Sequence, residues 1–89
     1  MLIPAGRTLI GNFTVQNRGT EALHQGRVEV AYGGGLQAES APFYLGPGGT
    51  RQVDVRLANP RAAPLDVRSA TVRLLGDDGA VVSTGDYTL

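Results

Sequence analysis

The 89-residue sequence contains no cysteine, no tryptophan and no lysine. Without cysteine the chain cannot form a disulfide, use a thiolate nucleophile or hold a metal through sulfur. Without lysine it cannot carry a Walker-type phosphate loop, because the lysine of that loop contacts the phosphates. Several common routes to catalysis and to metal binding are therefore closed by composition alone.

An excess of charge is missing as well. Eight basic residues balance eight acidic ones, so the formal net charge is zero and the isoelectric point is about 6.5. Binding to a phosphate backbone needs a sustained positive field, so we expect no nucleic-acid partner. No apolar run approaches the ~20 residues of a membrane-spanning helix, and the opening MLIPAGRTLIG lacks the apolar core of a signal peptide. We therefore expect no membrane insertion.

Histidine is present once, as His24. A transition-metal site would need a second imidazole or a thiol, and an acid–base pair would need a carboxylate held close to the ring. A chain of this length forms one domain, residues 1–89, with one thin core and little room for a deep cleft. We expect no enzyme activity, no catalytic residue, no metal ligand and no cofactor.

Alternation of apolar and polar residues is the main pattern that is present. It runs through residues 9–17, 27–32, 53–57 and 80–87, with weaker segments at 1–5, 36–39 and 42–45. This period of two indicates half-buried strands, and no segment shows the spacing of an amphipathic helix. In residues 65–75 the apolar parity switches between Val67 and Ala70, which predicts a bulge or a crossing between sheets. We recognise no internal repeat in the sequence.

Turn residues separate these segments about every ten positions. The prediction is an all-β fold, a sandwich of six or seven antiparallel strands in two sheets, with an open barrel as the alternative. Gly46-Pro47-Gly48-Gly49 looks at first like a phosphate cradle. Pro47 lacks an amide hydrogen, however, and the residues that follow form a strand by their period. We interpret the loop as a turn in which Gly48 has a positive φ.

Two motifs resemble those of bacterial immunoglobulin-like modules. Residues 13–20 (FTVQNRGT) resemble the strand followed by Asn-x-Gly-Thr of cell-adhesion-related bacterial domains, and Leu45, Pro47, Gly48 and Thr50 resemble their later Leu-x-Pro-Gly-x-Thr turn. Similar motifs occur in major-sperm-protein and Hydin-type sandwiches. The resemblance spans residues 9–57 and implies an immunoglobulin-like β-sandwich, without implying an activity.

The resemblance favours a non-enzymatic binding, spacer or assembly module of a larger bacterial surface or secreted protein, with the periplasm as an alternative location. Its partner would be another protein or a neighbouring domain, contacted through a sheet face or by strand addition at an edge. The edges we expect are residues 42–45 and 81–87. A carbohydrate-binding accessory module and a self-assembling subunit that forms homo-oligomers are the alternatives.

Isolated apolar side chains at outward positions are the candidate contact residues. Ile10, Tyr44 and Val82 form this predicted interaction surface. A carbohydrate site would instead need a row of exposed rings from Tyr32, Tyr44 and Tyr87. The aspartates of Gly76-Asp77-Asp78-Gly79 are explained as hairpin-turn residues, and whether they bind calcium is left open.

Overall fold

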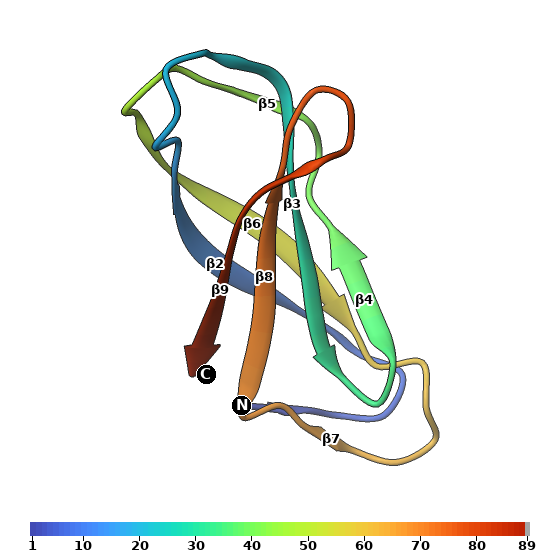
Figure 1. Ribbon diagram of the computed structural model, residues 1–89. Coiled ribbons are helices and arrows are strands. Elements are labelled where there is room, and N and C mark those ends of the chain that lie inside the picture. Colours follow the sequence, from blue (N-terminus) through green and yellow to red (C-terminus); the bar gives the residue numbers. More distant parts are fainter. Residues whose placement is uncertain (89) are drawn as a thin grey trace.

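The computed structural model describes residues 1–88, which contain nine strands and no helix (Figure 1). The strands are β1 (Leu2–Ile3), β2 (Thr8–Gln16), β3 (Leu23–Gly33), β4 (Leu36–Glu39), β5 (Phe43–Leu45), β6 (Thr50–Ala58), β7 (Leu65–Asp66), β8 (Ser69–Leu75) and β9 (Val81–Thr88). The expectation of an all-β fold is therefore confirmed. The described residues contain nine strands and not the six or seven expected, because the two-residue β1 and β7 are too short to show a clear alternation in the sequence.

All strand pairs are antiparallel. One sheet has the order β4-β3-β8-β9, with β5 paired to the beginning of β3, while β2 pairs with β6 and the short β1 pairs with β7. Within residues 1–88 no pairing joins the β2–β6 ribbon to β4 or β9, so the strands do not close into a barrel. The predicted parity switch is a crossing between sheets: Leu65 and Asp66 pair with β1, and Ser69 begins β8.

The β2–β6 ribbon lies against the four-stranded sheet, and the two facing surfaces form one apolar core (Figure 1). The ribbon contributes alternate residues of each strand, and so does the sheet. These buried side chains include Phe13, Val15, Val53, Val55 and Leu57 from the ribbon, and Val28, Val30, Tyr32, Val72 and Leu74 from the sheet. The period of two read in the sequence is thus the period of burial.

Tyrosine hydroxyls connect the two layers at both sides of the sandwich. The Tyr32 hydroxyl donates to the Ala58 carbonyl oxygen of β6 at 2.5 Å, and the Tyr87 hydroxyl donates to the Thr14 carbonyl oxygen of β2 at 2.6 Å. The Tyr87 ring also meets the Phe13 ring edge-on, with centroids 5.4 Å apart. The Thr14 carbonyl therefore lies on the edge of β2 that faces β9, and the Ala58 carbonyl lies on the edge of β6 that faces away from β2.

The structure contains an internal repeat with an offset of 42 residues. A turn with a positive-φ glycine precedes each strand of the ribbon: Arg7 N donates to Pro4 O across Gly6 (φ 69°), and Gly49 N donates to Gly46 O across Gly48 (φ 70°). The nine-residue strands β2 and β6 follow, and β3 then corresponds to β7 together with β8. The predicted positive φ of Gly48 is confirmed.

A buried asparagine ends each strand of the ribbon in the same way. Asn17 accepts a hydrogen bond from Gly19 N and donates to Glu21 O and Leu45 O, and Asn59 accepts one from Arg61 N and donates to Ala63 O and Ile3 O. Each partner of Asn59 lies 42 residues from the matching partner of Asn17. Asn17 thus stabilises the turn that follows β2.

Sequence inspection missed this repeat because few positions are identical. The matching positions that carry the same residue include Gly6 and Gly48, Thr8 and Thr50, and Asn17 and Asn59. The glycine sites need a positive φ and the asparagine sites need a buried amide, whereas an inward strand position accepts any apolar side chain of suitable size. The two halves are therefore alike in hydrogen bonding and different in sequence.

Candidate interaction site

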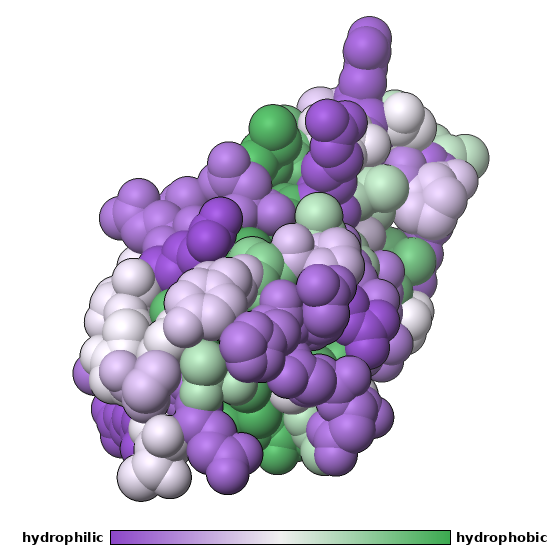
Figure 2. Space-filling view, turned by 90° about the horizontal axis from the view of Figure 1, so that it is seen from above, coloured by the Kyte–Doolittle hydropathy of each residue, from purple (hydrophilic) through white to green (hydrophobic). Residues whose placement is uncertain are grey.

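The three predicted contact residues are all exposed, but they lie on different strands. The exposed fractions are 62% for Ile10, 55% for Tyr44 and 43% for Val82. Ile10 pairs with Arg56 near the end of β6, whereas Tyr44 precedes the turn that begins β6, so these two side chains lie toward opposite ends of the ribbon. Ile10 therefore does not share a patch with Tyr44. On the face drawn in Figure 2, small hydrophobic areas are separated by hydrophilic side chains.

Two free strand edges lie where the sequence predicted them, and a third lies on a strand for which none was predicted. Strand β9 ends the four-stranded sheet, and β5 pairs only with β3. Strands β2 and β6 pair only with each other, so each has one free edge, and these two edges are the longest in the described chain. The free edge of β2 was not predicted. The sequence did not single out β2, because its alternation shows which face is buried and not how many neighbours it has.

The hydrogen bonds define which backbone groups lie on the free edge of β2. Asn17 exchanges backbone hydrogen bonds with the loop before β6, so its peptide groups face β6. The Thr14 carbonyl receives the Tyr87 hydroxyl, so it faces away from β6. Because peptide groups alternate sides along an antiparallel strand, the N–H and C=O groups of Ile10, Asn12, Thr14 and Gln16 all lie on the free edge.

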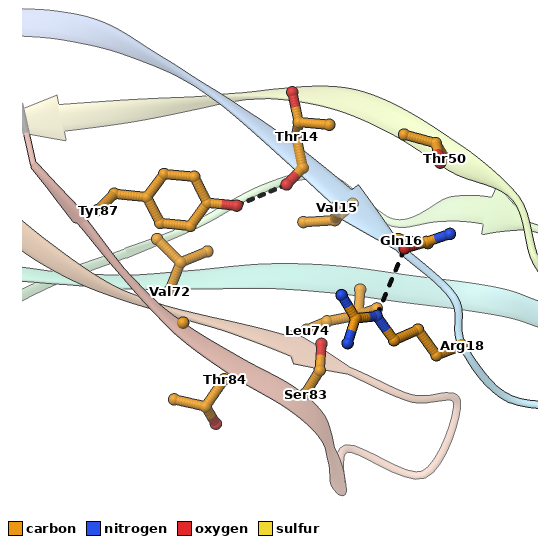
Figure 3. Close-up of a pocket in the computed structure, with 11 residues that line it drawn as sticks. Thr14, Val15, Gln16, Arg18, Thr50, Val72, Leu74, Ser83, Thr84 and Tyr87 are labelled. Carbon is orange, nitrogen blue, oxygen red and sulfur yellow. Dashed lines mark hydrogen bonds between the residues drawn. The ribbon is translucent and has the colours of Figure 1, made fainter.

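A groove of about 390 Å³ opens between this edge of β2 and strand β9 (Figure 3). Val15, Val72 and Leu74 line its apolar floor, and Thr14 and Gln16 line the β2 wall. Figure 3 places the Tyr87 ring at one end of the groove and Arg18, whose Nε donates to Gln16 Oε1 at 3.4 Å, at the other.

Small residues of β9 create this groove. Ser83 pairs with Leu74, Gly85 with Val72 and Tyr87 with Ala70, so all three β9 residues face the interior of the sandwich. Only Tyr87 is large enough to reach β2. An apolar residue at position 83 or 85 would fill the space, so the strand that should close this side of the core leaves it open instead.

The opposite side of the sandwich is closed. There Tyr32, which is only 4% exposed, fills the space between β6 and β4, and the partly buried Leu36 and Ala38 of β4 pack against the core. The residue that corresponds to Tyr32 in the internal repeat is Leu74. The two sides thus differ at this position, which is tyrosine on the closed side and leucine on the groove side, and in the small residues that β9 presents to the groove.

The glycine-rich loop does not present its amides to a ligand. Gly48 N donates to Asn17 O at 2.7 Å and Gly49 N donates to Gly46 O at 3.0 Å, so both amides are used within the protein. The interpretation of this loop as a turn is confirmed. The loop precedes β6, and its backbone hydrogen bonds attach it to Asn17 at the end of β2.

The aspartates of the hairpin turn also bind within the protein. Asp77 Oδ1 accepts hydrogen bonds from the backbone N of His24 at 2.9 Å and of Gln25 at 2.7 Å, and Asp78 Oδ1 accepts one from Ala80 N at 3.0 Å. Gly79 N donates to Gly76 O, which confirms the hairpin turn. Among residues 1–88 no three histidine, cysteine or acidic side chains converge as a metal site would require.

One carboxyl group has a shifted pKa. The Arg68 guanidinium donates to Asp66 Oδ2 at 2.8 Å and lowers the pKa of the Asp66 carboxyl below its usual value. Both side chains belong to the exposed crossing between β7 and β8 and are absent from the groove between β2 and β9. This pair therefore provides no acid–base chemistry to the groove.

Comparison with known protein families and with curated proteins gives no match for this chain. Within the described residues, no helix has the length and apolar character needed to cross a membrane. The features of the structure that bear on function are thus the groove and the hydrogen bonds along the edges of β2 and β9.

Proposed function

We propose that this chain is an immunoglobulin-like β-sandwich that acts as a non-enzymatic protein-binding module. The strand order supports the fold assignment. In immunoglobulin-like domains strands B and E pair in one sheet, while strands C, F and G pair in the other, with an added C′ strand beside C. Strands β2 and β6 match B and E, and the order β4-β3-β8-β9 matches C′-C-F-G.

The free edge of β2 is the observation that carries the binding function. It presents a row of N–H and C=O groups beside the groove, of which the Thr14 carbonyl also accepts the Tyr87 hydroxyl, and such an edge is a template for an added strand. An extended segment of a partner protein would form antiparallel or parallel hydrogen bonds with this edge. In this proposal the module belongs to a larger bacterial surface or secreted protein and serves as its binding, spacer or assembly unit.

The carbohydrate-binding alternative has less support. Tyr32 is buried, the Tyr87 ring packs against Phe13, and Tyr44 is left as the exposed tyrosine ring of the described chain. A flat row of rings for stacking on sugars is not formed by these three residues.

A peptide selection tests the proposed function directly. Random linear peptides would be selected on the immobilised domain and then titrated into the ¹⁵N-labelled protein. We expect the amide signals of Asn12, Thr14 and Gln16 to shift, and these amides to become protected from exchange with solvent. Peptides that bind elsewhere, or a selection that yields none, would contradict strand addition at β2.

The variant Thr14→Pro isolates the backbone contribution. Proline removes an amide hydrogen that faces the edge and not β6, so the ribbon keeps its ladder while the added strand loses a partner. Binding of the selected peptide should weaken at least tenfold in Thr14→Pro and stay within about twofold in the control Thr14→Ala, which keeps the amide.

A further inference from the structure

The internal repeat relates the groove between β2 and β9 to the opposite side of the sandwich, where a tyrosine side chain fills the corresponding space. On the opposite side of the sandwich, the Tyr32 ring lies between β3 and β6, and its hydroxyl donates to the edge-facing carbonyl of Ala58. The offset of 42 residues relates Tyr32 to Leu74 and Ala58 to Gln16. Leu74 and Gln16 both line the groove.

From this correspondence we infer that the groove binds the tyrosine side chain of an extended partner segment. This inference rests on the proposed function, strand addition at β2, and adds to it the chemistry of the side chain that the partner must carry. The phenol ring would lie on Val15, Val72 and Leu74. Its hydroxyl would donate to the Gln16 carbonyl, as the Tyr32 hydroxyl does to Ala58.

The hydrogen bonds along β2 support this choice of side chain. Of the two edge-facing carbonyls that border the groove, the Thr14 carbonyl is already bound by the Tyr87 hydroxyl. The Gln16 carbonyl is the next acceptor on the same edge, and no side chain of residues 1–88 donates to it. A carbonyl oxygen has two acceptor positions, so the Gln16 carbonyl can accept both an amide of the added strand and a phenol hydroxyl. A ring without a donor, such as phenylalanine, would fill the space and leave the second position unused.

Charge at the mouth of the groove also suits a phenol ring. The exposed Arg18 lines the groove beside Gln16, whereas the corresponding position on the closed side is Pro60. A guanidinium that lies over an aromatic face attracts it, as Arg51 does at 5.4 Å from the Phe43 ring centroid. The groove thus offers an apolar floor, one acceptor and one cation.

A titration with p-cresol, which has the tyrosine side chain's ring and hydroxyl, tests the inference on the intact chain. We expect saturable shifts of the amide signals of Gln16, Leu74, Ser83 and Gly85 in the ¹⁵N spectrum. Toluene, the phenylalanine analogue, should bind at least fivefold more weakly. Equal binding of the two compounds, or p-cresol shifts that leave these four residues unchanged, would overturn the inference.

Two variants that fill the groove from within provide the control. Leu74→Tyr recreates the plug found on the closed side, and Gly85→Val narrows the groove from β9. We expect both to abolish the p-cresol shifts while the spectrum stays dispersed, and Gly85→Val keeps the test valid if Leu74→Tyr does not fold. Shifts that persist in a folded variant would overturn the inference.

The same variants separate this inference from the proposed function and from self-association. Selected peptides that bind the β2 edge but contain no tyrosine, and that bind the folded Leu74→Tyr variant equally well, would overturn the inference and leave strand addition intact. A mass in sedimentation that rises with protein concentration, and no longer rises in Leu74→Tyr, would identify the occupant as a second copy of the chain. That result would overturn the assignment to a different partner.

Discussion

Two buried asparagine side chains fix the ends of the central ribbon at the residue scale. Asn17 and Asn59 are each 1% exposed, and their amide groups bind backbone groups of two different segments. An amide buried in this way is stabilising only while all its partners are present, because the partners have no access to water. The Asn17 side chain therefore joins the loop after β2 to β5, which precedes β6. The Asn59 side chain joins the loop after β6 to β1, which precedes β2.

Replacing either asparagine by alanine should destabilise the fold strongly. We expect Asn17→Ala and Asn59→Ala each to lower the free energy of unfolding by about 2–3 kcal/mol, because buried backbone groups lose their partners. Asn12→Ala is the control, since Asn12 binds Asp54 on the exposed face, and it should cost about 0.5 kcal/mol or less. Urea denaturation measures all three, and a cost for Asn17→Ala no greater than that for Asn12→Ala would refute the role of the buried amide.

The turn before β6 depends on one glycine. Gly48 has φ 70°, and an added Cβ would meet nothing within 4 Å, so a substitution there is penalised by backbone conformation alone. We expect Gly48→Ala to cost about 1–2 kcal/mol. Gly46→Ala is the control at a residue of the same turn without a positive φ, where a Cβ would make ordinary contacts with the Tyr44 ring. Equal costs at the two positions would show that the turn is different from the one described.

At the scale of elements, the strands and two of the sheet edges were predictable, whereas the free edge of β2 was not. Alternation located β2, β3, β6 and β9, and the parity switch located the crossing between β7 and β8, because burial of one face has a direct signature in the sequence. The free edge of β2 has no such signature. The groove has no such signature either, since serine and glycine are not apolar, and only the pairing of Ser83 with Leu74 and of Gly85 with Val72 shows that they face the core.

Two inward glycines of edge strands should respond to valine in opposite ways. Gly85 faces the groove, and an added Cβ would lie 3.7 Å from the Tyr87 ring, so Gly85→Val should raise the free energy of unfolding by about 0.5–1 kcal/mol through strand propensity and burial. At Gly11 the added Cβ would lie 2.8 Å from Cε2 of Phe13, so Gly11→Val should lower the free energy of unfolding by about 1–3 kcal/mol. Thermal or urea denaturation compares them, and a destabilising Gly85→Val would mean that the groove is not open.

At the scale of the whole molecule, the two halves of the repeat interlock and do not stack as separate units. Strand β2 of the first half pairs with β6 of the second, and β3 pairs with β8, so each sheet contains strands of both halves. The halves differ where the groove lies, because Tyr32 closes one side and Leu74 leaves the other open. The proposed binding site is thus a break in the symmetry of the fold.

Amide hydrogen exchange along β2 tests the central claim, that this strand pairs on one side and is free on the other. We expect Phe13 and Val15, whose amides face β6, to exchange on the order of 100-fold more slowly than Asn12 and Thr14, whose amides face the free edge of β2. Alternating protection of this kind would establish the free edge on which both proposals depend. Uniform protection from Asn12 to Gln16 would contradict it, because another strand would then have to occupy the edge.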